Sequence, residues 1–129
     1  MFSATFPPPI QRAAGEFLNE YVFIVIGVVG GACRDVKQEF MEVQRKDKRG
    51  KILEILGSLG TNDKAFVFCG SKMGVDFLAA TLASINMSCA SMHDERPQSQ
   101  REQAIREFTT GERQILVATA VAARGLGKN

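Results

Sequence analysis

Small polar and cationic residues follow three strand-like segments of this 129-residue chain. They lie in Cys69-Gly-Ser-Lys72, in Met92-His-Asp-Glu-Arg96 and in Ala118-Thr-Ala-Val-Ala-Ala-Arg-Gly125. Free backbone amides at a helix N-terminus favour a phosphate group, to which Lys72 would add a cation and Thr119 a hydroxyl. Such donors along one edge suit a phosphodiester backbone better than a small apolar ligand. The same residue types also serve as turns and caps in any strand–helix loop, so a purely structural role stays open.

Two other kinds of site have weaker support. Cys69, between a strand and a helix N-terminus, could be a stabilised thiolate of the kind found in sulfurtransferases and cysteine phosphatases. An inert buried cysteine is the stronger interpretation, because Asp76 follows where such sites usually hold an arginine. His93 is the only histidine, and no suitably spaced Cys completes a metal site around it, so we expect a loop or capping role and no bound metal.

Composition sets broad limits. Hydrophobic residues make up 45% and charged residues 23%, and the net charge is +2, which excludes wholesale disorder and gives no argument for nucleic acid by itself. Three cysteines at these spacings build neither a disulfide framework nor a zinc knuckle. The longest apolar stretch, 21–29, is far shorter than the roughly 20 residues of a membrane span. We expect a soluble, intracellular chain without membrane contact.

The elements that must position these residues follow from periodicity. Helices are expected at 7–18, 48–59, 73–85 and 97–108, the last closed by Gly111, and strands at 21–26, 36–43, 65–69, 87–92 and 114–118. The run 21–26 is apolar throughout, as in a strand buried on both faces. Strands that alternate with helices predict right-handed βαβ units and a parallel sheet, an α/β fold. A glycine-rich linker at 28–35 separates a helix–strand remnant (1–27) from the sheet domain (36–129).

An ordered set of motifs resembles the DEAD-box RNA helicases. Ser3-Ala4-Thr5 is similar to motif III, and Val29 to Gln38 resembles the interdomain linker of the Vasa branch. Motif IV is matched by Val67 to Lys72, the Q-x-x-R segment by Gln98 to Arg101, and motif V by Val117 to Leu126. The resemblance runs through nearly the whole chain, from motif III to motif V.

The resemblance implies the end of a first RecA-like domain at 1–27 and a partial second one, the helicase C-terminal domain, at 36–129. The parent would be an ATP-dependent RNA helicase that binds RNA along its backbone and opens short duplexes by ATP hydrolysis. The implied roles are RNA binding for Gly70, Lys72, Arg101 and Thr119, support for Phe68 and Gln98, nucleotide contact for Arg124 and Gly125, and coupling of ATP state to RNA for Ser3, Ala4 and Thr5. Phe68 would pack against the Q-x-x-R segment.

The same resemblance implies ATP and Mg²⁺ as cofactors of the parent, RNA and the first helicase domain as partners, and a cytoplasmic location. Likeness to the Vasa branch in particular implies perinuclear germ granules, with germ-granule proteins as partners. Because these 129 residues contain neither a P-loop nor the arginine fingers, we expect them to be inactive alone. Two departures stand out: Asp94 replaces a glycine of the family pattern and should repel phosphate, and Gly127 replaces an acidic residue. A non-catalytic RNA- or protein-binding module is the alternative function.

Overall fold

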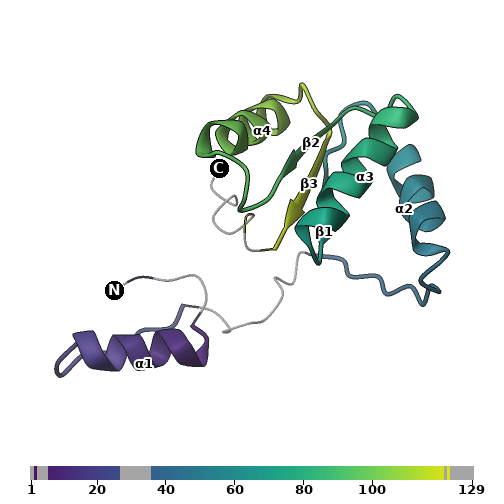
Figure 1. The fold of residues 1–129 in the computed structure, drawn as a ribbon. Coiled ribbons are helices and arrows are strands. Elements are labelled where there is room, and N and C mark those ends of the chain that lie inside the picture. The colour runs from purple at the N-terminus through teal and green to yellow at the C-terminus, as the bar shows by residue number, and fades with distance from the viewer. Residues whose placement is uncertain (1, 3–5, 27–35, 121, 123–129) are drawn as a thin grey trace. The chain divides into compact units, whose positions relative to one another are not determined.

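The computed structural model describes residues 2, 6–26, 36–120 and 122, and divides the chain into two compact units, Met1–Met41 and Glu42–Asn129. Figure 1 shows the elements of each unit. The predicted linker at 28–35 lies outside the described residues. Within the described ranges, no helix has both the length and the apolar character needed to cross a membrane.

The first unit contains helix α1 (Pro8–Phe17), which confirms the predicted helix. Pro8 and Pro9 suit the first turn, because their fixed backbone angle matches a helix and their missing amide hydrogens would be unpaired there. The Gln11 side chain donates a hydrogen bond to the carbonyl oxygen of Phe6 (2.9 Å), and the ring of Phe6 stacks on that of Phe23 with centroids 4.9 Å apart. These contacts hold the segments that flank α1.

Two predicted strands are wrong. Residues 21–26 and 36–43 form no strand, and both segments are largely exposed. Val22 and Ile26, for example, are 83% and 97% exposed, although the first segment was expected to be buried on both faces. A strand forms only where a neighbour completes its hydrogen bonds, and no partner strand for either segment exists among the described residues. High β-propensity alone does not supply that neighbour.

The second unit is an α/β sheet, as predicted. Its elements run in the order α2 (Lys48–Gly57), β1 (Ala65–Cys69), α3 (Lys72–Ser84), β2 (Cys89–Met92), α4 (Gln98–Thr110) and β3 (Ile115–Thr119). The described strands form a parallel three-stranded sheet in the order β1-β3-β2, so the last strand inserts between the other two. Parallel strands are joined by crossover connections, here through α3 and α4, so strands that are consecutive in the chain need not be neighbours in the sheet.

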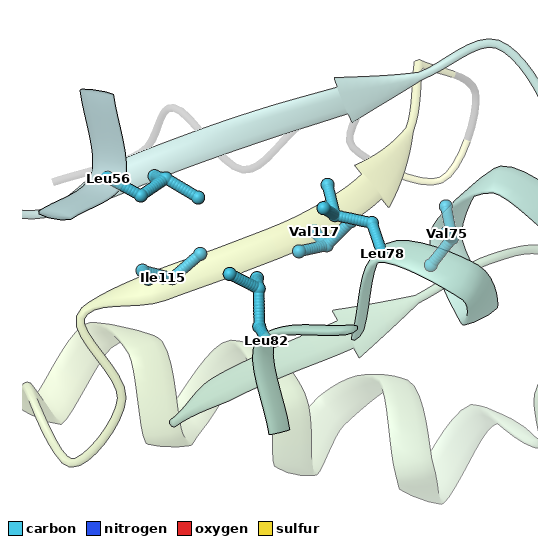
Figure 2. Close-up of a cluster of buried hydrophobic side chains, with 6 residues drawn as sticks. All are labelled: Leu56, Val75, Leu78, Leu82, Ile115 and Val117. Carbon is cyan, nitrogen blue, oxygen red and sulfur yellow. The ribbon is translucent and has the colours of Figure 1, made fainter. Parts of the chain in front are cut away.

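Helices cover both faces of this sheet, with α2 and α3 on one side and α4 on the other (Figure 1). The alternation of β3 explains both cores. Ile115 and Val117 point to the first face, where they pack with Leu56 of α2 and with Leu78 and Leu82 of α3 (Figure 2). The alternate residues of β3 point to the opposite core, which contains Ala90, Met92, Ala104, Leu116, Ala118 and Ala122. The central strand is therefore buried on both faces, as expected of a parallel sheet.

Helix ends agree with the sequence signals. Gly111 follows α4 with a φ of +82°, the left-handed conformation that glycine adopts most readily, and its amide bonds the carbonyl of Phe108. Ser71 begins α3 as its N-cap. Both residues position the ends of helices that flank the sheet, and Ser71 belongs to the candidate site itself.

Candidate nucleic-acid interface

The register of the sheet brings the three predicted polar segments to one edge. Cys69 at the end of β1 pairs with Thr119 at the end of β3, and Met92 at the end of β2 pairs with Ala118. The segments that begin at Gly70, His93 and Ala120 therefore all leave the sheet at its carboxyl end. This is the edge at which open α/β sheets bind ligands.

The β1–α3 turn presents an exposed helix N-terminus. The Ser71 hydroxyl oxygen accepts a hydrogen bond from the Gly74 amide at 3.1 Å, which fixes the first turn of α3. A Cβ on Gly74 would lie 3.3 Å from the Ser71 Oγ, so a side chain there would crowd this cap. Gly70 is exposed with open space around it. The Gly70 backbone and the Lys72 side chain are thus both exposed at this turn, which suits an anionic ligand.

Thr119 lies at the matching position on β3. Its side-chain oxygen is 3.4 Å from the Ala122 amide, from which it accepts a long hydrogen bond. The hydroxyl hydrogen is free to turn toward another acceptor. Thr119 is half-buried, so its hydroxyl would be a positioned donor at the sheet edge.

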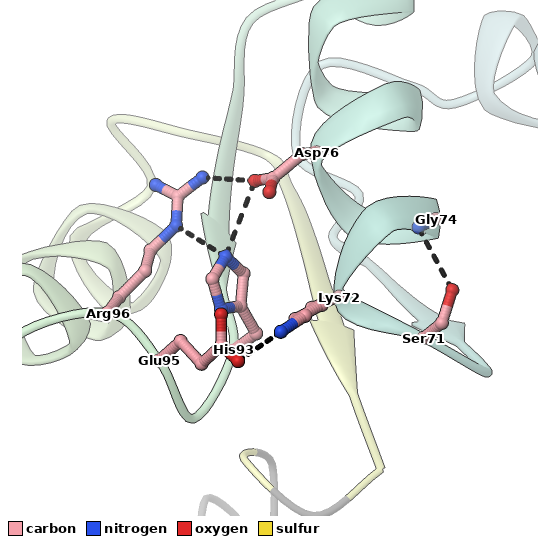
Figure 3. Close-up of polar contacts among 7 residues, drawn as sticks. All are labelled: Ser71, Lys72, Gly74, Asp76, His93, Glu95 and Arg96. Carbon is pink, nitrogen blue, oxygen red and sulfur yellow. Dashed lines mark hydrogen bonds and ion pairs between the residues drawn. The ribbon is translucent and has the colours of Figure 1, made fainter.

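A polar network joins the loop after β2 to the first two turns of α3 (Figure 3). Arg96 Nη2 donates to Asp76 Oδ1 at 2.7 Å, and Arg96 Nε lies 3.3 Å from His93 Nε2. The buried His93 ring also approaches Asp76, with Nε2 3.4 Å from Oδ1. Lys72 Nζ donates to Glu95 Oε1 in a separate ion pair.

The network shifts two pKa values. The hydrogen bond from Arg96 is the main cause that lowers the pKa of Asp76, assisted by the charge of His93. The hydrogen bond to Glu95 is the main cause that raises the pKa of Lys72, with further help from the charges of Glu95 and Asp94. Lys72 is therefore a stable cation at this edge, and Asp76 a stable anion.

Helix α4 holds the two residues of the Q-x-x-R segment together. Arg101 Nη1 donates to Gln98 Oε1 at 3.2 Å, one turn apart on the helix. Arg101 is half-buried, and its Nε has no hydrogen-bond partner among the described residues. Gln98 stands at the first position of α4, directly after the loop that leaves the sheet's carboxyl edge. Gln98 thus orients the Arg101 guanidinium beside the start of α4.

Residues 47–127, more than half of the chain, match the family described as the helicase conserved C-terminal domain. The chain belongs to this helicase family. The β1–α3 turn, the loop after β2 and the end of β3 are all parts of the helicase C-terminal domain.

Curated relatives place the chain beside Vasa-type helicases, as the motifs predicted. It is 54% identical over 126 residues to the ATP-dependent RNA helicase vasa of Drosophila melanogaster, a match that covers 98% of this chain and 19% of that protein. It is 48% identical over 127 residues to the ATP-dependent RNA helicase DDX4 of Mus musculus, covering 98% of this chain and 18% of that one. The chain thus spans about a fifth of the length of these relatives.

Solved structures confirm the fold. A DEAD box protein from the hyperthermophile Methanococcus jannaschii is 30% identical with a TM-score of 0.62, over 96% of this chain and 32% of that chain. The Escherichia coli DEAD-box protein SrmB, solved bound to regulator of ribonuclease activity A, is also 30% identical, with a TM-score of 0.56 over 62% of this chain and 46% of that one. The α/β helicase domain fold predicted from the motifs is therefore correct.

The structure places only part of the predicted site. Gly70, Lys72 and Thr119 come to one edge of the helicase domain, and Arg101 and Gln98 begin the adjacent α4. Ser3, Ala4 and Thr5 lie outside the described residues, as do Arg124 and Gly125, the two predicted nucleotide contacts. Gly127 lies outside them too.

Phe68 was expected to pack on the Q-x-x-R segment. In the structure its ring stacks on Phe66 at 4.7 Å between centroids, and Phe66 in turn meets Phe108 of α4 edge-on at 5.8 Å. Phe68 itself remains 61% exposed. The described aromatic contacts therefore connect Phe68 to α4 through Phe66, at the end of that helix away from Gln98.

A Cys69 transferase is not supported. Burial raises the pKa of the Cys69 thiol, whereas a nucleophilic thiolate needs a lowered pKa. Asp76, the acidic residue on the first turns of α3, accepts a hydrogen bond from Arg96. Its negative charge would not stabilise a thiolate, which is also an anion. Cys69 thus behaves as a packing residue whose strand end positions the turn.

The contact between Lys72 and Glu95 was not foreseen from the sequence. The two residues are 23 positions apart and meet because α3, which Lys72 begins, packs against β2, which the Glu95 loop follows. One signal existed: Lys72 and Asp76 lie four residues apart on α3, opposite in charge to Glu95 and Arg96 in the loop. His93 lies in the loop after β2, as expected, but its contact with Asp76 was not predicted.

Proposed function

We propose that this chain is part of a Vasa-like, ATP-dependent RNA helicase, and that its sheet edge binds the RNA backbone while the whole protein opens short duplexes. The observation that carries the proposal is the convergence of Lys72, the α3 amides and Thr119 at the carboxyl end of one parallel sheet. An ammonium group, backbone N–H groups and a hydroxyl are the donors that bind phosphates without reading base sequence. The similarity to RNA helicases supports RNA as the source of those phosphates.

The domain organisation is part of the same proposal. Residues 1–27 would end a first helicase domain, 28–35 would be the linker, and 36–129 would belong to the second domain. Arg101 and Gly70 would complete the RNA contacts, with Phe68 and Gln98 in support. Arg124 and Gly125 would face ATP, which the whole protein would use with Mg²⁺, and Ser3, Ala4 and Thr5 would couple ATP state to RNA.

The cellular part of the proposal rests on the likeness to Vasa and DDX4 proteins alone. The first helicase domain would be the intramolecular partner, and germ-granule proteins would be partners in a cytoplasmic location. ATP hydrolysis would belong to the whole protein, since its P-loop is not among these 129 residues.

The RNA contact is tested by fluorescence anisotropy, with a labelled single-stranded oligouridylate titrated with the full chain. We expect weak, salt-sensitive binding that Lys72→Ala together with Thr119→Ala weakens by roughly tenfold, because a charge-assisted and a neutral hydrogen bond are removed. The matched control is Lys64→Ala with Thr109→Ala. Lys64 precedes β1 and bonds the Thr109 carbonyl, so this pair lies at the amino end of β1.

The control pair should leave the affinity within about twofold of the original. If both double variants weaken binding equally, only general positive charge is at work, and the proposed edge is wrong. Binding that is unaffected by Lys72→Ala and Thr119→Ala would contradict the proposal in the same way.

A further inference from the structure

The loop after β2 is fastened to helix α3 at two points one helical turn apart. Glu95 bonds Lys72 at the first residue of α3, and Arg96 bonds Asp76 in the next turn at 2.7 Å. Figure 3 shows both contacts on the same side of α3, with the His93 ring between the loop and Asp76. Because Lys72 and Asp76 have opposite charges, as do Glu95 and Arg96, the pairing fixes which loop residue meets which helix residue.

The consequence falls on the Lys72 ammonium. A cation that is to bind phosphate should be free, but here a carboxylate already accepts its hydrogen bond. The side chains of Lys72 and Glu95 are 48% and 58% exposed, so both can be reached from solvent and neither is locked in a core. The pair is of the exposed kind that competes with other ions in solution.

We propose that Glu95 is an intramolecular competitor for the RNA phosphate at Lys72, so that RNA binds this edge only by displacing the Glu95 carboxylate from the Lys72 ammonium. This inference rests on the proposed function, because it names a residue that regulates the RNA contact. The Arg96–Asp76 pair keeps the loop beside α3 when Glu95 is displaced, so the carboxylate stays near and can return. Glu95 thereby limits the affinity of the edge and speeds release of the strand.

The salt dependence follows from counting ions. A phosphate bound by a free lysine releases a condensed counterion, which makes binding weaken with salt. When the lysine is first paired with Glu95, the freed carboxylate takes up a cation as the phosphate loses one. In the original chain, Lys72 should therefore contribute little to the slope of log K against log salt. Once Glu95 is neutral, Lys72 should contribute the slope expected of one phosphate contact.

The test compares the full chain with its Glu95→Gln variant, using a labelled single-stranded oligouridylate in fluorescence anisotropy between about 50 and 200 mM salt. We expect Glu95→Gln to tighten binding about two- to fivefold at the lowest salt, the range of an exposed ion pair. The slope of log K against log salt should become steeper by about 0.7, one phosphate's share for a single strand. Glu54→Gln is the matched control, since Glu54 pairs with Lys51 on α2 and loses the same charge.

A second comparison isolates the Lys72 contact from general repulsion. In a Lys72→Ala background, Glu95→Gln should change affinity by less than about 1.5-fold, because the group for which Glu95 competes is gone. Tightening of equal size with and without Lys72 would overturn the inference, as would equal tightening by Glu54→Gln. RNA binding that Glu95→Gln leaves unchanged would overturn this inference alone, whereas RNA binding by neither form would overturn the proposed function and the inference together.

Discussion

Asp76 is the anion on which the loop after β2 depends, and its charge should show in the pH dependence of stability. The Arg96 hydrogen bond lowers its pKa in the folded state, so folding is favoured by this pair above the unfolded value of about 3.9. The contribution is lost as pH falls through the lower, folded pKa. We expect Asp76→Asn to cost about 0.2–1 kcal/mol near neutral pH, as for a largely exposed pair, and progressively less below about pH 4.

Urea unfolding of both forms over this pH range measures the difference. In an Arg96→Met background the pH dependence of the Asp76→Asn effect should largely vanish, because the main cause of the pKa shift is absent. A difference between the two forms that stays constant, or grows on acidification, would show that the ion pair does not stabilise the fold.

Cys69 gives a second prediction at the scale of single residues. Burial raises the pKa of its thiol, so less thiolate exists at neutral pH than in a free cysteine. With Cys33 and Cys89 replaced by serine, iodoacetamide should alkylate Cys69 with a pH midpoint above about 8.5. A midpoint below neutrality would restore the thiolate that a transferase needs, and would contradict the packing role.

At the scale of elements, two glycines should respond to the same substitution with opposite signs. Gly111 holds a φ of +82° after α4, so Gly111→Ala should destabilise the fold by about 1 kcal/mol or more. Gly50 lies inside α2 with open space at its Cβ position, so Gly50→Ala should stabilise by up to about 1 kcal/mol. Urea unfolding midpoints measure both. Equal effects would mean that φ at Gly111 does not decide the end of α4.

Local signals were sufficient for the elements of the helicase domain. The helix boundaries were predicted to within two residues, because apolar periodicity shows where the helices pack and Gly111 marks where α4 ends. The β3 segment was predictable because its apolar residues are continuous, as in a strand buried on both faces. Its place between β1 and β2 was not predicted, since strand order depends on long-range pairing.

The same dependence explains the two failures. The segments 21–26 and 36–43 have the composition of strands, but pairing decides whether a strand forms, and the described residues supply no neighbour. For the candidate site, the positions of Lys72 and Thr119 at the ends of predicted parallel strands were enough to predict that both lie at one edge of the sheet. It could not show that Glu95 reaches Lys72, because that contact depends on where β2 and its loop lie in the sheet.

At the scale of the whole molecule, the chain combines a modest net charge of +2 with donors gathered at one edge of the sheet. General attraction to RNA should then be weak, and any preference for this edge must come from placed groups and not from bulk basicity. Under the proposed competition, Glu95 in the loop of His93 to Arg96 would set how much of that attraction is available. The fold therefore both positions the cation and restrains it.

The most direct measurement is a ¹H–¹⁵N NMR titration of the labelled full chain with a single-stranded oligouridylate. We predict that the amide shifts move at the carboxyl ends of the strands, in Gly70 to Lys72, in the loop after β2 and at Thr119. Amides at the amino ends, at Lys64, Ser88 and Gln114, should hold their positions. Amide shifts that are confined to the amino ends of the strands, or that are spread evenly over the basic residues of the chain, would contradict RNA binding at this edge.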